Sequence, residues 1–467
     1  MLGWKRRVSS HPWIVLVTTL LLAAGVLAAC APPQAESRSA VPSGPLRADR
    51  SGSPSEAQSR PNVLLVTMDT LRADAVGVYG NDAAKTPTMD LLAQEGARFS
   101  LAMTAVPQTN PTHASIFTGM FPNRHGIFHH MASMLSPDVR PMAEILSDEG
   151  YTTAGHYSWV SFDPQYSGLE RGFDTYERHT VDRGWPADQP TDWFEQLMDS
   201  KADATSDGVL SWAESGAVEP FFTWIHYNDA HWPYDPVAPY DTMFDQCDTC
   251  LDGSLDSIIR IAEGYSPTPR EASHLKGLYD GEVAFADQQL GRIIGWLREK
   301  GILDNTIVIV TADHGEGFGE KGLWSHQEVL YNTASRVPLI IRYPAVVPAG
   351  QVIEAPASSI DILPTVLNIL GIESPDGVEG RSLLPLILEQ ETGEDRAAFT
   401  RLWDAAKLSV VYHGMKLIEN MQTGDVELYD LGQDPAETTN LIHSRPGEAS
   451  ELQALLDAWK IDQGVSP

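Results

Sequence analysis

The chain alternates between short, continuously apolar runs and longer segments whose apolar residues have a helical spacing. Runs of this kind at 63–66, 221–225, 307–310 and 337–341 are typical of strands buried on both faces of a parallel sheet. Between the second and third runs, residues 283–297 place their apolar side chains on one helical face and end near a Lys-Gly pair. Strands that alternate with helices predict an α/β sandwich.

The pattern changes after about residue 395. Short alternating runs at 408–412, 415–418 and 426–431 are separated by glycine-containing turns, and a last helical pattern covers 449–459. This pattern predicts an antiparallel meander followed by a helix. We therefore expect a small C-terminal subdomain at residues 396–467.

The N-terminus has the features of a targeting segment. Three basic residues at positions 5–7 precede an apolar stretch at 14–26 that is short for a transmembrane helix. The stretch ends in Leu-Ala-Ala-Cys, which resembles the processing box of bacterial lipoproteins, and an ordinary signal-peptidase site is the alternative. We expect residues 1–29 to be a signal peptide and Cys30 to be acylated, which predicts an exported bacterial lipoprotein anchored on the periplasmic or cell-surface side.

Residues 30–60 are rich in Ser, Pro, Ala and Gly. Such a composition cannot bury a core, so this segment is expected to be a flexible tether. The whole chain of 467 residues is 42% hydrophobic, which is ordinary for a globular protein. Its net charge of −31 favours solubility and repels polynucleotides, so no nucleic-acid partner is expected.

Two cysteines remain besides the one at the processing box. Cys247 and Cys250 stand in a Cys-Asp-Thr-Cys loop, which in an oxidising compartment predicts a local disulfide. A zinc site would need a second such pair, and the sequence has none. A redox-active pair is the other alternative.

Polar residues capable of chemistry follow three of the predicted strands. The first strand runs into Asp69, and the strand at 307–310 runs into Asp313 and His314. The strand at 221–225 runs into His226, Asp229 and His231. Ligands of open α/β sheets bind beyond the carboxyl ends of strands, so these side chains together predict a metal site. Any one of them alone could equally be a capped strand end or a surface turn.

A fourth element begins at Thr109. Pro111 suits the first turn of a helix, which places the Thr109 hydroxyl at or just before the helix start. Free backbone N–H groups and the positive end of the helix dipole would then favour a sulfuryl or phosphoryl group there. A simple helix cap is the alternative.

Several spaced motifs resemble those of sulfatases of the alkaline phosphatase superfamily. They run in the family's order from about residue 61 to about 442, at 62–66 with 69–74 and 79–80, 111–119 with 124–126, 311–316, 360–365, and 427–431 with 434–435. The resemblance implies an alkaline-phosphatase/sulfatase-like sandwich with a mixed, mostly parallel central sheet. The catalytic domain is expected at residues 61–395, before the C-terminal subdomain.

The resemblance also implies roles for the candidate residues. Asp69, Asp313 and His314 would hold one divalent cation, and Thr109 would be both a metal ligand and the nucleophile. His231 would contact the transferred group or protonate the leaving oxygen.

Three further residues complete the implied site. His326 lies near the position of a substrate-binding lysine, and we expect it to be catalytic. His113 and Asp229 are expected to bind substrate. A second cation held by Asp229, His231 and His326 is an alternative.

The departures from the sulfatase pattern change the expected chemistry. Classical sulfatases oxidise Cys or Ser at the Thr109 position to formylglycine, whereas threonine would give a ketone, and His113 replaces the arginine of the modification motif. No formylglycine is therefore expected. Thr70 stands where the family has its second Asp. His314 stands where the family has the Asn of its calcium site. Imidazole in place of hard oxygens favours Zn²⁺ or Mn²⁺ over Ca²⁺.

The resulting hypothesis is a metal-dependent hydrolase of sulfate or phosphate/phosphonate esters that uses Thr109 as a metal-activated nucleophile, with site chemistry leaning towards phosphoesters. The substrate would be a small-molecule, glycan or lipid ester. One alternative is a phospho-group transferase that acts on envelope glycans or lipids. The other is a non-catalytic lipoprotein that binds anions.

Overall fold

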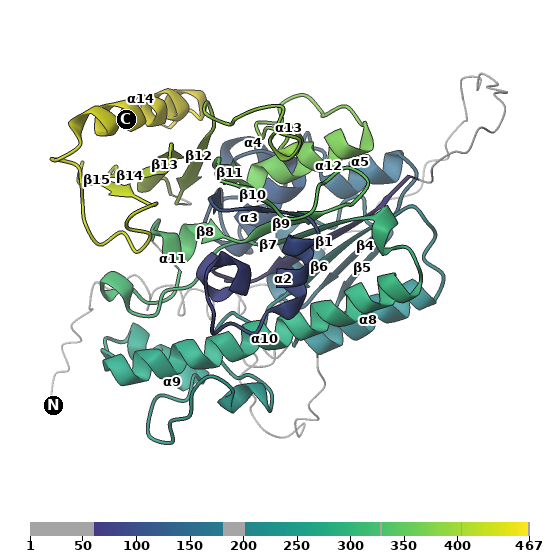
Figure 1. Ribbon diagram of the computed structural model, residues 1–467, viewed down its shortest axis with the longest axis horizontal. Helices are drawn as coiled ribbons and strands as arrows, with labels where there is room; N and C mark the ends of the chain where they lie inside the picture. The colour runs from purple at the N-terminus through teal and green to yellow at the C-terminus, as the bar shows by residue number, and fades with distance from the viewer. Residues whose placement is uncertain (1–59, 181–200, 327–328, 403, 466–467) are drawn as a thin grey trace, which may run out of the picture.

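The computed structural model describes residues 60–180, 201–326, 329–402 and 404–465. The predicted signal peptide, Cys30 and all of the tether but its last residue lie outside these residues. Within them, the largest sheet has eight strands in the order β10-β2-β9-β7-β1-β6-β4-β5 (Figure 1). Its strands are β1 (Asn62–Met68), β2 (Ala97–Phe99), β4 (Thr152–Tyr157), β5 (Thr175–Arg178), β6 (Phe221–Tyr227), β7 (Thr306–Ala312), β9 (Leu339–Arg342) and β10 (Gln351–Ile353).

This sheet is mixed and mostly parallel. The neighbouring strands β7, β1, β6, β4 and β5 all run parallel, and only β9 is antiparallel to its neighbours β7 and β2. The fold class predicted from the sequence is therefore confirmed. A second, smaller sheet has three strands in the order β11-β3-β8. They are β3 (Ala102–Met103), β8 (Arg336–Val337) and β11 (Ala357–Ser358).

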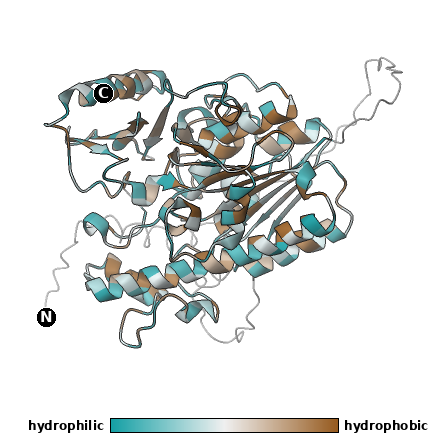
Figure 2. Ribbon diagram, viewed as in Figure 1, coloured by the Kyte–Doolittle hydropathy of each residue, from teal (hydrophilic) through white to brown (hydrophobic). Residues whose placement is uncertain are grey.

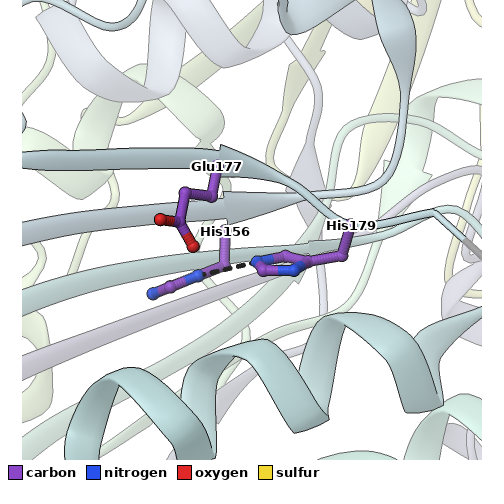
Figure 3. Close-up of side chains that lie close together, drawn as sticks. All are labelled: His156, Glu177 and His179. Atoms are coloured by element: carbon purple, nitrogen blue, oxygen red, sulfur yellow. Dashed lines mark hydrogen bonds between the residues drawn. The ribbon is translucent and has the colours of Figure 1, made fainter. Parts of the chain in front are cut away.

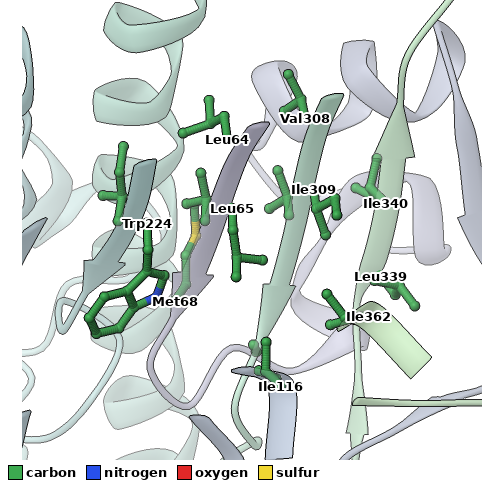
Figure 4. Close-up of a cluster of buried hydrophobic side chains, with 14 of the residues drawn as sticks. Leu64, Leu65, Met68, Ile116, Trp224, Val308, Ile309, Leu339, Ile340 and Ile362 are labelled. Carbon is green, nitrogen blue, oxygen red and sulfur yellow. The ribbon is translucent and has the colours of Figure 1, made fainter. Parts of the chain in front are cut away.

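The central strands are apolar because both faces of the sheet are covered. Every residue of β1, β6 and β7 is buried. Figure 4 shows side chains such as Leu65, Trp224 and Ile309 from three adjacent strands in one cluster, with Ile116 and Ile362 from helices packed against them. The continuous apolar runs in the sequence thus mark the middle of the core.

Helices cover the two faces of the sheet (Figure 1). The long helix α10 and its neighbour α8 pack on one side, whereas α3, α5 and α12 pack on the other. Figure 2 shows α10 with hydrophilic and hydrophobic residues in alternation, as a helix with one solvent-facing side requires. The helices are α2 (Pro87–Gln94), α3 (Thr109–Thr118), α4 (Pro122–His125), α5 (Met142–Asp148), α6 (Pro164–Ser167), α8 (Ala202–Glu214), α9 (Leu255–Ala262), α10 (Pro269–Glu299), α11 (Asn332–Ser335), α12 (Ile362–Leu370), α13 (Leu384–Ile387) and α14 (Pro446–Asp462). None of the helices in the described ranges is long and apolar enough to span a bilayer.

The C-terminal part forms its own antiparallel sheet. The strands β12 (Ala397–Arg401), β13 (Lys407–Tyr412), β14 (Met415–Asn420) and β15 (Val426–Asp430) pair in sequence order, and α14 packs on β13 and β14. The sequence predicted the last three of these strands and the final helix, but not β12. The apolar core beneath α14 also includes Val106 and Ile360, so this sheet packs directly on the main part of the chain.

A disulfide bond joins Cys247 and Cys250, whose Cα atoms are 5.5 Å apart. The bond lies in the loop that precedes α9. The prediction of a local disulfide is confirmed.

Candidate metal centre and active site

The three strands with polar residues at their ends are direct neighbours in the sheet. Thr67 of β1 pairs with His226 of β6 on one side and with Thr311 of β7 on the other. Because the strands are parallel and in register, Asp69 and Asp313 leave the sheet at the same edge. The predicted convergence of these side chains is therefore present.

Asp69, Asp313 and His314 form a compact, buried group. Their ligand atoms all lie within 4.8 Å of one another. Nε2 of His314 lies 3.5 Å from Oδ2 of Asp313 and 3.8 Å from Oδ1 of Asp69. Both carboxylate oxygens of Asp69, and Oδ2 of Asp313, are buried without a hydrogen-bond partner in the part of the chain that the structure describes.

Such a group suits a divalent cation. Burial raises the pKa of Asp69, and burial together with the charge of Asp69 raises the pKa of Asp313. Burial lowers the pKa of His314, but Asp313 and Asp69 offset this and raise it overall. Two adjacent buried carboxylates are costly unless a positive charge compensates them. Ligands of a tetrahedral zinc ion lie roughly 3.3 Å from one another, since each is about 2.0 to 2.1 Å from the metal, and the observed spacings are close to this.

Thr109 is the first residue of α3, and its buried hydroxyl faces the same group. Its Oγ1 lies 3.5 Å from Nε2 of His314. The residue at the N-cap position is Gln108, and no side-chain cap bond is formed. Thr109 is thus not the helix cap, and its hydroxyl is available to the metal group at the positive end of the helix.

His231 and His326 lie beside the metal group. The ring of His326 lies 4.2 Å from that of His314 and 5.3 Å from that of His231, measured between ring centres. Nδ1 of His231 donates a hydrogen bond to the carbonyl of Trp232 at 2.6 Å, so in the neutral ring Nε2 carries a lone pair. Burial lowers the pKa of both His231 and His326, which favours the neutral rings.

His113 does not have the predicted position. It is fully buried beneath the site, and its Nδ1 donates to the carbonyl of Thr109 at 2.7 Å while its Nε2 lies 2.9 Å from Oγ1 of Thr67. Burial lowers the pKa of His113 to about 3. Both ring nitrogens are used inside the protein and the ring is neutral, so the prediction that His113 contacts the substrate is wrong.

Asp229, which is predicted to bind substrate, lies just after β6. It is buried, which raises its pKa to about 7, and the charge that most opposes this rise is Lys201. Lys201 itself forms a 2.7 Å ion pair with Glu282. Among the described residues, Asp229, His231 and His326 do not form a group with metal-ligand spacing, so the structure gives no support to a second cation there.

Two residues that the sequence did not single out join the site. Glu316 lies 3.3 Å from Nδ1 of His326, measured from Oε1. His130 donates from Nδ1 to Oδ1 of Asn110 at 3.0 Å, and its pKa is lowered by burial and by the charges of His314 and His326. Glu316 belongs to the motif at 311–316, but the sequence alone assigns it no role. No local sequence pattern indicates that His130 would lie near the site.

A second cluster of possible ligands lies on β4 and near the end of β5. Figure 3 shows His156, Glu177 and His179, with Nδ1 of His156 bonded to Nε2 of His179 at 2.9 Å. This bond occupies one nitrogen of each ring. The cluster therefore has a structural explanation, and it is not part of the site at the ends of β1 and β7.

Comparison with known families agrees with this geometry. The family model for sulfatases matches residues 61–372, and the model described as N-sulphoglucosamine sulphohydrolase, C-terminal, matches residues 319–460.

Relatives and solved structures cover most of the chain. An N-acetylglucosamine-6-O-sulfatase of Bacteroides thetaiotaomicron is 27% identical, with 91% of this chain and 87% of the relative covered. A multifunctional alkaline phosphatase superfamily protein of Trinickia caryophylli is also 27% identical, over 72% of this chain and 79% of the relative. The structure of a phosphonate monoester hydrolase from Silicibacter pomeroyi has a TM-score of 0.72 at 25% identity, with 86% of this chain and 95% of that chain covered. The chain therefore belongs to the sulfatase family of the alkaline phosphatase superfamily and is an ester hydrolase of that family.

Proposed function

We propose that the protein is a metal-dependent hydrolase of phosphate or phosphonate esters that uses Thr109 as its nucleophile. The observation that carries this proposal is the hydroxyl of Thr109, which lies 3.5 Å from His314 at the start of α3. Threonine cannot be oxidised to the aldehyde of formylglycine, so the hydroxyl itself has to attack. Direct attack by a hydroxyl followed by hydrolysis of the resulting ester is ordinary phosphoryl-transfer chemistry.

Asp69, Asp313 and His314 would hold the cation beside this hydroxyl. Bound there, a divalent ion would lower the pKa of the Thr109 hydroxyl and offset negative charge on the transferred group. We propose Zn²⁺ or Mn²⁺ rather than Ca²⁺, because His314 contributes an imidazole nitrogen.

Each step of the proposed reaction is carried out by residues of this chain. Oγ1 of Thr109 forms a bond to phosphorus while the bond from phosphorus to the alcohol oxygen breaks. The N-terminal N–H groups of α3 stabilise the equatorial oxygens. His231 or His326 takes up the proton that the Thr109 hydroxyl loses and gives it to the leaving alcohol. The neutral ring then accepts a proton from the water that attacks phosphorus, the bond from phosphorus to Oγ1 breaks, and the ring returns the proton to Thr109.

A sulfate ester of a sugar is the second candidate substrate. Its support is the family model together with relatives whose names include an N-acetylglucosamine-6-O-sulfatase and an ulvan-active sulfatase of Formosa agariphila. The phosphorus esters of the main proposal are supported by the likeness to a phosphonate monoester hydrolase and by Thr109 at the nucleophile position.

The experiment that separates them compares esters of one alcohol. We would measure kcat/KM of the zinc- and manganese-loaded protein with the phosphate, phenylphosphonate and sulfate esters of 4-nitrophenol. The proposal expects either phosphorus ester to react at least about tenfold faster than the sulfate, which is about 1.4 kcal/mol of barrier. A faster sulfate reaction would instead support the sugar sulfate.

We further propose that the chain is anchored to a membrane through lipid on Cys30, on the periplasmic or cell-surface side. The Leu-Ala-Ala-Cys sequence after a basic and then apolar N-terminus supports this proposal. An anchored hydrolase would act on esters of glycans or lipids of the envelope, or on small esters that diffuse to it.

A further inference from the structure

We infer that Lys321 is a positioning residue for His326, because it holds the tip of the hairpin at residues 317–325 against the C-terminal sheet. The inference rests on the proposed function, in which His326 is one of two histidines that transfer the proton. It goes beyond that function by giving the C-terminal sheet, whose strands supply none of the site residues described above, a part in shaping the site.

His326 directly follows this hydrogen-bonded hairpin. The backbones of Gly317 and Ser325 exchange two hydrogen bonds, each of 3.0 Å. The hairpin therefore brings its two flanking residues together, and Oε1 of Glu316 lies 3.3 Å from Nδ1 of His326. The position of the His326 ring beside His314 depends in consequence on where the hairpin lies.

Two tyrosine rings hold the tip of the hairpin. Nζ of Lys321 lies over both of them, 4.2 Å from the ring centre of Tyr331 and 4.7 Å from that of Tyr429, and it donates a hydrogen bond of 3.2 Å to the hydroxyl of Tyr429. Both tyrosine hydroxyls donate to Oε2 of Glu427 at 2.8 Å, so one carboxylate fixes the two rings. Glu427 and Tyr429 belong to β15 of the C-terminal sheet. An ammonium group is attracted to the faces of such rings.

The backbone conformation of Lys321 indicates that its side chain has a purpose at the tip. Its φ angle is 55°, in the left-handed region that residues other than glycine rarely adopt. Gly319 and Gly322 have φ angles of 99° and 75°, so the other left-handed positions of the tip are occupied by glycine. A residue with a side chain keeps such a conformation only where its surroundings compensate the cost. The contacts with Tyr331 and Tyr429 provide that compensation.

Arg72 holds the start of the hairpin to the catalytic domain. Its Nη1 donates to the carbonyl of Glu316 at 2.9 Å and to Oε1 of Glu320 at 2.7 Å. The guanidinium is buried, and its Nε and Nη2 donate to the carboxylate of Asp74. The hairpin is thus fixed at its start by one part of the chain and at its tip by another. Lys321 is exposed, so the tip can be released without leaving a buried charge unpaired.

The first test measures the hairpin itself and needs no substrate. Amide hydrogen exchange of the peptide that contains residues 317–326 would be followed by mass spectrometry in wild type, Lys321→Met and Lys321→Arg. Lys321→Met keeps a long side chain but removes the ammonium, so the peptide should exchange at least about fivefold faster. Lys321→Arg keeps a cation over the rings and should exchange close to the wild-type rate. Unchanged exchange in Lys321→Met would overturn the inference.

The matched control is Lys300→Met. Lys300 also places its ammonium over an aromatic ring, 5.7 Å from the ring centre of Trp296, but it lies at the end of α10. This variant should leave both the exchange of the hairpin peptide and the rate of ester hydrolysis at their wild-type values. An effect as large as that of Lys321→Met would refute a specific role for Lys321.

The second test asks whether the hairpin places His326. In wild type the ring of His326 lies 4.2 Å from that of His314, measured between ring centres. In crystals of Lys321→Met the His326 ring should be displaced by about 1 Å or more, and kcat/KM for a phosphorus ester should fall at least about tenfold. A ring that stays in place, or a wild-type rate despite a displaced ring, would overturn the inference.

Two further measurements separate positioning from a general loss of structure. Zinc affinity of Lys321→Met should equal that of wild type, because Asp69, Asp313 and His314 lie outside the hairpin. Lys321→Arg should restore kcat/KM. A weaker zinc affinity that matches the loss of activity would show that Lys321 supports the fold as a whole and would overturn its specific role.

Failure of the proposed function gives a different result. Wild-type protein would then hydrolyse none of the 4-nitrophenyl esters, whatever the state of the hairpin. Faster exchange and a displaced His326 ring in Lys321→Met would still support the placement of this ring by Lys321, because neither measurement depends on turnover.

Discussion

Oγ1 of Thr109 and Nε2 of His314 lie 3.5 Å apart, although 205 residues separate them in the sequence. The first begins helix α3 and the second follows strand β7. The contact joins the proposed nucleophile to a proposed metal ligand and makes Thr109 the most informative residue to change.

Thr109→Ala removes the attacking oxygen and one expected metal ligand together. We predict that ester hydrolysis falls by roughly three orders of magnitude, or about 4 kcal/mol of barrier. Thr109→Ser keeps a hydroxyl at the same place and should retain substantial activity. Thr109→Cys, produced with a formylglycine-generating enzyme, should not yield an efficient sulfatase, because His113 still interrupts the modification motif. Steady-state kinetics together with circular dichroism would check this. Wild-type rates in Thr109→Ala would show that Thr109 has only a structural role.

His314→Asn exchanges an imidazole ligand for an amide oxygen. We expect the preference for Zn²⁺ or Mn²⁺ over Ca²⁺ to weaken, because hard oxygen ligands suit calcium better. Metal analysis of the purified wild type and competition titrations of both proteins would measure the preference. A wild-type protein that carries only calcium and is fully active would contradict the prediction.

Lys416→Met should destabilise the fold. Nζ of Lys416 is fully buried and lies 2.9 Å from Oε1 of Glu437 and 3.0 Å from Oγ of Ser335, which joins β14 to the segment around α11. Removing one partner of a buried ion pair leaves an uncompensated charge and costs about 3 to 5 kcal/mol. Urea unfolding would measure the loss of free energy of unfolding.

The controls for this change are a second substitution and a surface lysine. Adding Glu437→Gln to Lys416→Met removes the orphaned charge and should recover part of the stability. Lys85→Met alters an exposed lysine and should change stability by less than about 0.5 kcal/mol. Equal unfolding curves for Lys416→Met and Lys85→Met would refute the importance of the buried pair.

The disulfide between Cys247 and Cys250 should have a structural rather than a catalytic role. It lies in a polar loop, and neither cysteine belongs to the metal group. The double Cys→Ser variant should keep activity within about tenfold of wild type, or about 1.4 kcal/mol of barrier. A larger fall with unchanged thermal stability would mean that the pair takes part in the reaction.

Cys30→Ser tests the proposed lipid anchor. The variant should lose incorporation of a labelled fatty acid in the bacterial cell and should move from the membrane fraction to the soluble fraction. The comparison is the wild-type chain expressed in the same cells. Labelling that persists in Cys30→Ser would show that the cysteine is not the acylated residue.

The sequence alone predicted the parts of this protein that local patterns encode. The runs at 63–66, 221–225 and 307–310 became β1, β6 and β7, because only residues buried on both faces of a sheet remain continuously apolar. The polar residues directly after two of these strands, Asp69 and Asp313, could therefore be assigned to one site in advance.

The positions that tertiary packing alone determines were missed or misplaced. His113 lies four residues after Thr109, a spacing equally compatible with the site and with the core, and packing against Thr67 buried it. Asp229 became a buried carboxyl near the charge of Lys201, and His130 reached the site without any sequence signal. The ring of His226 was likewise positioned by Thr67 and Asp69, because contacts between neighbouring strands that are far apart in the sequence depend on the strand order of the sheet, which no local pattern records.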